Sequence, residues 1–176
     1  AEATVIGTTF DSNGLGDGTA GKSDGIRIVG DGTLTVTDIT ISNSGLDGLG
    51  ACCGTVPNKP VVNISGSTIT GSGEDGLNFF DGAVATVSIT TITGSGSDGI
   101  EAAGNSAGTE GPELTLTTVT ISNNGANGMD IFDKTEKLTA SDLTVDQNTF
   151  AGLNTGSMGD LAVLSSSFTN NGANGI

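Results

Sequence analysis

Aspartates stand directly before glycines at regular intervals along this chain. Asp24, Asp47, Asp75 and Asp98 are separated by 23, 28 and 23 residues, so they occupy one position of a repeat. If such a repeat stacks upon itself, neighbouring carboxylates lie close enough to repel each other unless something neutralises them. An acidic row of this kind could bind a cation that neutralises it. Asp-Gly is also a common turn sequence, which would explain the aspartates without any ligand.

Two of these turns resemble the calcium-binding nonapeptide of RTX proteins. The stretches "GSGEDGL" and "GSGSDGI" fit its G-x-G-x-D-x-(L/I) element. The resemblance implies Ca²⁺ held by carboxylate and turn carbonyl oxygens, with Asp47, Asp75 and Asp98 as weak candidate ligands. This chain departs from that pattern, because it has one such turn per repeat and a period near 23 residues rather than nine. Calcium and a plain Asp-Gly turn both stay open.

Acid pairs offer a second kind of chemistry, since two carboxylates are enough to cleave a glycosidic bond. Candidates on an outward face are Asp75, Asp98, Glu101 and Asp130. The sequence shows no aromatic surface on which a sugar would stack, because Trp and Tyr are absent and Phe is rare. We assign no catalytic residue from the sequence and expect no enzyme.

Two further local motifs carry chemistry. Cys52 and Cys53 are adjacent, and adjacent cysteines rarely bond to each other without strain. Free thiols, a vicinal disulfide and a cross-link to another molecule therefore stay open. Asn63-Ile64-Ser65 is the only N-x-(S/T) sequon, so Asn63 is a candidate glycosylation site.

Composition and charge limit the classes of protein. The chain has 176 residues with 30 Gly, no Trp, Tyr or His, six Phe, and a net charge of −15. Nucleic-acid binding needs clustered Lys and Arg, so that class is close to excluded. No window has the roughly 18 apolar residues of a membrane span. Few Lys and many Thr, Ser, Gly and Asn favour a secreted or cell-surface protein.

The elements that must position these side chains follow from an internal repeat. A Gly followed by Ile, Leu or Met recurs at intervals of 23 to 29 residues, at Gly25, Gly48, Gly76, Gly99, Gly128, Gly152 and Gly175. Apolar residues recur at fixed distances before each of these glycines and alternate with polar ones. Such alternation predicts short strands with one buried face. Val5 and Phe10 join the same columns if residues 14–21 are an insertion.

The repeat, best seen in "ITISNNGANGMDI", resembles the right-handed parallel β-helix superfamily of pectate-lyase-like coils and their surface-protein relatives. We expect an all-β, single-domain solenoid over residues 1–176, with about seven coils and loops near 14–21, 50–60 and 102–113. "NNGANG" is then a corner, where Asn and Gly tolerate positive φ and stacked Asn side chains bond between coils.

The superfamily hosts enzymes, adhesins and fibres, so the fold alone does not give a function. Pectin-degrading relatives use His or Arg at the cleaved bond, whereas this chain has no His and a single Arg. Its negative charge would also repel a polyuronate. A Thr/Ser array beginning at Thr9 and Thr40 resembles the ice-binding face of β-solenoid antifreeze proteins, although Asp11 and Asp146 interrupt it.

The sequence begins and ends within the repeat, which suggests end-to-end association. Apolar ends of stacked coils would pair with those of another copy and generate a filament. The expected stacking residues are Val5, Phe10, Leu161, Val163, Phe168 and Ile176. We therefore predict a structural filament subunit or adhesin-like stalk. The alternatives are a calcium-dependent polysaccharide-binding or polysaccharide-cleaving module, an ice-binding protein, or a fragment of a longer chain.

Overall fold

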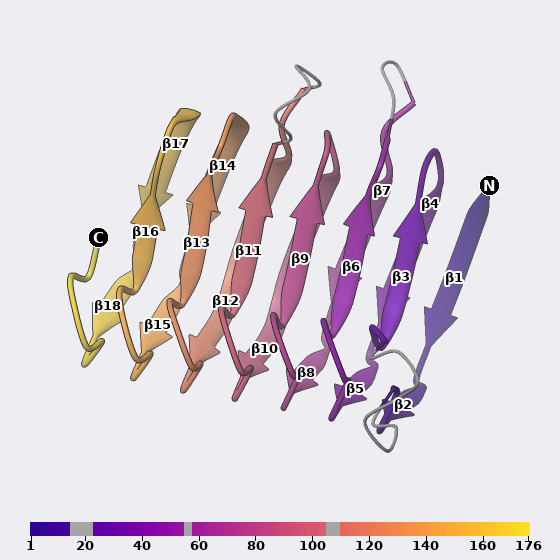
Figure 1. Cartoon of the computed structure of the whole chain (residues 1–176), viewed down its shortest axis with the longest axis horizontal. Coiled ribbons are helices and arrows are strands. Elements are labelled where there is room, and N and C mark those ends of the chain that lie inside the picture. The colour runs from indigo at the N-terminus through magenta and orange to yellow at the C-terminus, as the bar shows by residue number, and fades with distance from the viewer. Residues whose placement is uncertain (15–22, 55–57, 105–109) are drawn as a thin grey trace.

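The computed structural model describes residues 1–14, 23–54, 58–104 and 110–176. All regular elements in these ranges are β-strands, and every strand pairing in them is parallel. The chain winds through successive coils, and each coil places its strands beside the equivalent strands of the next (Figure 1). This confirms the all-β parallel β-helix that the repeat predicts.

The larger sheet has twelve strands and bends along its length. One part follows the order β1-β4-β7-β10-β12-β14-β17, and β2, β5, β8, β15 and β18 pair beside it. The bounds are β1 Glu2–Ile6, β2 Thr9–Asp11, β4 Thr33–Thr37, β5 Thr40–Ser42, β7 Val61–Ser65, β8 Thr68–Thr70, β10 Val84–Thr93, β12 Glu113–Ser122, β14 Thr135–Ser141, β15 Thr144–Asp146, β17 Met158–Leu164 and β18 Ser167–Thr169.

The smaller sheet has six strands in the order β16-β13-β11-β9-β6-β3. Its strands are β3 Ile26–Val29, β6 Leu49–Cys52, β9 Leu77–Phe80, β11 Ile100–Ala103, β13 Met129–Phe132 and β16 Leu153–Thr155. Each begins directly after one of the repeat glycines. We call this sheet the short-strand sheet, and its outer face carries the candidate site.

The core consists of apolar side chains stacked in columns between the two sheets. Val36, Ile64 and Val87 form one such column, and Leu49, Leu77 and Ile100 form another; all six are at most 2% exposed. The first coil joins the columns as predicted, since Val5 pairs with Val36 and Phe10 with Ile41. A single coil cannot bury its apolar side chains alone. It does so only when equivalent side chains of neighbouring coils stack on them.

The corner "NNGANG" has a different physical basis from the one predicted. Only its first residue, Asn123, has a positive φ, of 56°. Its glycines are needed for close approach between coils instead. A Cβ on Gly128 would meet a methyl group of Val145 and would lie 2.6 Å from the carbonyl oxygen of Gly152.

The predicted bonding of stacked Asn side chains is confirmed. The amide nitrogen of Asn124 donates to Asn148 Oδ1 at 2.8 Å, and that of Asn148 donates to Asn171 Oδ1 at 2.9 Å. Their carbonyl oxygens also accept backbone N–H groups of the preceding coil. This ladder satisfies buried polar groups at the corner, as a buried amide requires.

Two predicted loops begin too early. Residues 50–52 belong to β6 and residues 102–103 to β11, where they pair in parallel with the neighbouring strands β3 and β13. Residue 113 likewise begins β12. The middle of these loops and almost all of the predicted insertion 14–21 lie outside the described residues.

Ile89 stands at the bend of β10 with a φ of 49°, and its side chain is 68% exposed. A β-branched residue is strained in this left-handed region, which Asn tolerates. Ile89→Asn is therefore expected to stabilise the protein by about 1 kcal/mol in urea unfolding. Leu164→Asn is the control, because Leu164 is equally exposed but has no positive φ. Equal gains in both variants would show that strain at Ile89 is not the cause.

Candidate functional site

The outer face of the short-strand sheet carries a polar row across its six strands. The parallel register aligns Glu101 with Asn78 on one side and with Asp130 on the other. The full row is Arg27, Gly50, Asn78, Glu101, Asp130 and Asn154. Its members are about 4.8 Å apart, the spacing of neighbouring strands. Its inward neighbours, such as Leu77 and Ile100, fill the core.

A second row lies beside it, at the turn before each strand. Asp24, Asp47, Asp75 and Asp98 stack here as predicted, and all four side chains are buried or nearly so. Each carboxylate accepts the backbone N–H of the equivalent residue on the next coil, as from Asp98 to Asp75 Oδ1 at 2.9 Å and from Asn127 to Asp98 Oδ1 at 2.6 Å. These acids therefore hold the corner together.

The two rows meet in a tight group of Asp75, Asn78 and Glu101. The amide nitrogen of Asn78 lies 3.1 Å from Asp75 Oδ2 and 3.3 Å from Glu101 Oε2. Burial raises the pKa of Glu101 to about 9, and a hydrogen bond to Asp75 with the repulsion of its charge adds to this. Glu101 is therefore a protonated acid at neutral pH, held beside an acceptor carboxylate.

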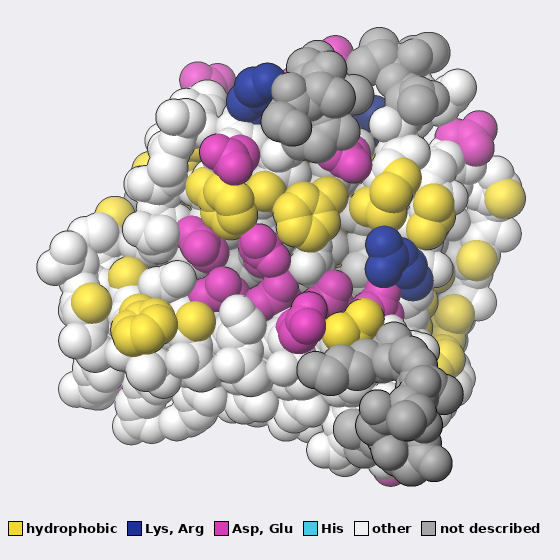
Figure 2. All heavy atoms as spheres, in the orientation of Figure 1, with side chains coloured by type: hydrophobic (Ala, Val, Ile, Leu, Met, Phe, Trp, Pro, Cys, Tyr) yellow, Lys and Arg dark blue, Asp and Glu magenta, His cyan; other side chains and the backbone are white. Residues whose placement is uncertain are grey.

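The surrounding acids respond to the same crowding. Burial raises the pKa of Asp47 to about 7, with a contribution from the charge of Asp75. The pKa values of Asp98 and Asp130 are also raised, in both cases chiefly by burial. One face of the molecule thus gathers carboxyl groups that hold protons more readily than ordinary surface acids (Figure 2).

An apolar row runs along the other side of the polar row. It is formed by the outward residues two positions further along each strand, Val29, Cys52, Phe80, Ala103 and Phe132. Figure 2 shows apolar side chains gathered beside the acidic ones on this face. Phe80 and Phe132, both half-buried, bring two of the six Phe side chains of the chain to this row. Phe80 and Phe132 belong to separate coils, and only the strand register reveals that they share a row.

A pocket of about 160 Å³ opens where the rows meet on the first coils. It brings together a cation, acids, an amide and an aromatic ring from β3, β6, β9 and their turns: Arg27, Asp47, Cys52, Glu74, Asn78 and Phe80. Arg27 pairs with Asp24 at 3.2 Å. Apolar walls with a few polar groups are typical of small-ligand sites.

Cys52 and Cys53 are bonded to each other, so the structure contains the vicinal disulfide that was one of three open arrangements. An intermolecular cross-link through these residues would require that bond to open first. Cys52 lines the pocket, whereas Cys53 follows β6 and is exposed.

Calcium binding by Asp47, Asp75 and Asp98 stays a prediction. Asp47 and Asp75 use Oδ1 to accept N–H groups of the next coil, and so does Asp98. Within the described residues, no three acidic, His or Cys side chains are grouped to hold a metal ion. Asn63 lies half-buried on β7, and its glycosylation stays a prediction.

The Thr/Ser array has the arrangement that the repeat predicts. Thr40, Thr68 and Thr91 align across successive coils, and the column continues through Thr9, Thr120, Thr144 and Ser167. A second column lies two residues further along each strand, and Asp11 and Asp146 interrupt its Thr and Ser residues. Asp11 accepts a hydrogen bond from Ser42, and Asp146 accepts one from Thr169. Ice binding by this array stays a prediction.

The residues expected to mediate stacking lie in the outermost described coils. Val5, Phe10, Val163 and Phe168 are partly buried against the core, while Leu161 and Ile176 are 45% and 65% exposed. End-to-end association through them stays a prediction.

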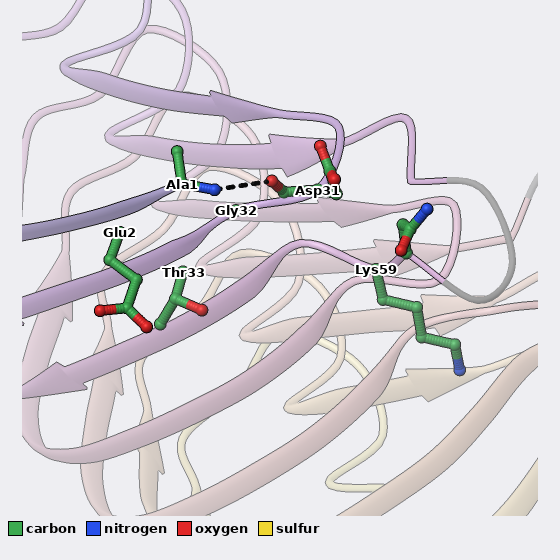
Figure 3. A pocket seen from close by; sticks show the side chains of 7 residues that line it. Ala1, Glu2, Asp31, Gly32, Thr33 and Lys59 are labelled. Atoms are coloured by element: carbon green, nitrogen blue, oxygen red, sulfur yellow. Dashed lines mark hydrogen bonds between the residues drawn. The ribbon is translucent and has the colours of Figure 1, made fainter.

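A second pocket, of about 320 Å³, lies at the first coil between Ala1, Asp31 and Lys59. Figure 3 shows the amino group of Ala1 directed at the carbonyl of Asp31, 3.4 Å away, with the Lys59 side chain extending away from both. The ammonium of Lys59 instead pairs with acids of later coils, Glu110 at 2.6 Å and Glu113 at 3.1 Å. Lys59 therefore ties coils together rather than serving the pocket.

Comparison with known proteins bears on the fold. The family described as "Right handed beta helix region" matches residues 56–176. Searches of curated proteins and of solved structures gave no match. Among the described residues, no helix is long and apolar enough to cross a membrane. The match covers more than half of the chain and agrees with its parallel coils, and the chain therefore belongs to the right-handed β-helix family.

Proposed function

We propose that the outer face of the short-strand sheet binds a polysaccharide. The observation that carries the proposal is the pocket in which Phe80 stands beside Asn78, Arg27 and Asp47. Sugars present apolar ring faces and hydroxyl edges, so an aromatic ring with carboxylates and amides beside it suits both surfaces. An extracellular location is part of this proposal.

The rows favour a chain-like ligand over a single small molecule. The polar and apolar rows continue side by side from β3 to β13, so both kinds of surface extend across several coils. The net charge of −15 and the carboxyl groups on this face would repel a polyuronate. We therefore propose a neutral or amine-bearing polysaccharide as the ligand.

Replacing Phe80 with alanine is expected to weaken polysaccharide binding about 5- to 30-fold, because an aromatic contact contributes roughly 1–2 kcal/mol. Binding can be measured by isothermal titration or affinity electrophoresis against neutral, amine-bearing and uronate polymers. Leu164→Ala, which removes an exposed apolar side chain from the larger sheet, should bind like the original protein. Equal loss in both variants, or tightest binding to the uronate, would contradict the proposal.

Glycoside hydrolysis is a second candidate, favoured by the raised pKa of Glu101. This reaction requires a carboxyl group that keeps its proton and a second carboxyl group beside it. Glu101 would protonate the leaving oxygen, and its cross-strand neighbour Asp130 is the opposing carboxylate. If the face cleaves, Glu101→Gln should abolish release of reducing ends while retaining binding, and Glu2→Gln on β1 should change neither.

A further inference from the structure

The Cys52–Cys53 disulfide stands at the edge of the pocket with its two sulfurs in different surroundings. Cys52 is only 6% exposed and lines the pocket, whereas Cys53 is exposed. An incoming thiolate can therefore reach Cys53 far more easily than Cys52. In thiol–disulfide exchange, the sulfur that is not attacked becomes the leaving group.

A guanidinium group lies beside the sulfur that would leave. Arg27 Nη2 is 3.5 Å from Cys52 Sγ, and Arg27 comes from the neighbouring strand β3, which holds it in register. A cation at this distance stabilises a thiolate and makes it a better leaving group. Asp47 and Glu74 also line the pocket and oppose a negative sulfur, and Arg27 is the one cation among the described lining residues that offsets them.

We propose that this disulfide is a redox-active site that external dithiols reduce. A thiolate of the dithiol bonds to Cys53 Sγ, the Cys52–Cys53 bond breaks, and Cys52 leaves as a thiolate beside Arg27. The second thiolate of the dithiol then attacks its own mixed disulfide and releases Cys53, which takes a proton. Two electrons pass to the protein disulfide, and the dithiol becomes a disulfide.

Reduction would change the wall of the pocket. Cys53 has a φ of 68°, in the left-handed region that is unfavourable for this residue, and it is bonded to Cys52 in this conformation. Opening the bond removes one constraint on that conformation, and it leaves a charged sulfur at Cys52, inside the apolar row between Val29 and Phe80. Any effect of reduction on ligand affinity rests on the proposed polysaccharide binding. The chemistry of the disulfide does not.

The test follows reduction of the folded protein by dithiothreitol, with iodoacetamide trapping of thiols and mass spectrometry. We expect two alkylated cysteines without loss of the far-ultraviolet circular dichroism. With glutathione as a monothiol, the mixed disulfide should map to Cys53. Arg27→Gln should slow reduction roughly tenfold, with partial rescue by Arg27→Lys. Lys137→Gln, which removes a positive charge from β14, should leave the rate unchanged.

Alkylation that occurs only after denaturation would overturn the proposal, and so would a mixed disulfide on Cys52. Equal rates for Arg27→Gln and Lys137→Gln would remove the assigned role of Arg27. Polysaccharide affinity is then compared between oxidised and reduced protein. If no polysaccharide binds either form while reduction proceeds as expected, the proposed ligand is wrong and the redox site stands.

Discussion

Gly128→Ala is expected to destabilise the protein by about 3 kcal/mol, near the upper end for an overpacked interior. The added Cβ would meet a methyl group of Val145 and would lie 2.6 Å from the Gly152 carbonyl oxygen and 2.9 Å from the Asn148 amide nitrogen. Two of these neighbours belong to stacked columns that cannot shift without disturbing the next coil. Thermal unfolding should occur roughly 6–12 °C lower.

Gly175→Ala is the matched control, because Gly175 holds the same place in the second copy of "NNGANG". A Cβ there would make only ordinary contact, 3.4 Å from the Phe168 Cβ. Its melting temperature should fall by a small fraction of the Gly128→Ala change. A large loss in both variants would mean that the motif needs glycine for its own conformation rather than for close approach between coils.

Stability should fall as pH rises, in contrast to proteins whose acids are paired with bases. The pKa of Glu101 is raised from 4.5 to about 9 in the folded protein, so between these values the native state holds a proton that the unfolded chain has lost. The favourable contribution is complete below pH 4.5 and disappears as pH rises through about 9. The raised pKa of Asp47 stabilises the folded protein in the same way, and this contribution disappears as pH rises through about 7.

Because Glu101 is partly solvated, the expected change is only about 1–2 kcal/mol, or roughly 2–8 °C in melting temperature across this range. Glu101→Gln should flatten the pH profile, since glutamine keeps a neutral side chain at every pH. Glu2→Gln removes the same charge from β1 and corrects for general repulsion in this acidic chain. Identical profiles for the two variants would rule out a buried proton on Glu101.

Much of the fold could be predicted because each coil repeats the same pattern of glycines and apolar residues. The interval between repeat glycines gives the register of the later coils, and the pairing of Val5 with Val36 follows once residues 14–21 are set aside as an insertion. The role of Gly128 could not be predicted in this way. Glycine permits positive φ and close approach equally well, and only the stacked neighbours distinguish the two.

The candidate site was predicted in part. The row of Asp24, Asp47, Asp75 and Asp98 was visible because all four precede the repeat glycines. Phe80 and Asn78 could not be assigned to the site from the sequence, because neither is acidic and only the strand register places them beside β11. The raised pKa of Glu101 depends on burial beside Asp75, two side chains from neighbouring coils whose contact a linear sequence does not display.

The parallel stacking of coils has a consequence for how the chain reaches its native state. The strand partners among the described residues lie 23 or more residues apart, as Leu77 and Ile100 do, so none of these pairings joins close neighbours in sequence. Two coils must first meet at the full entropic cost of closing such a loop, while every later coil adds to an edge that already exists. Folding should therefore begin slowly at one interior pair and then spread outward in both directions.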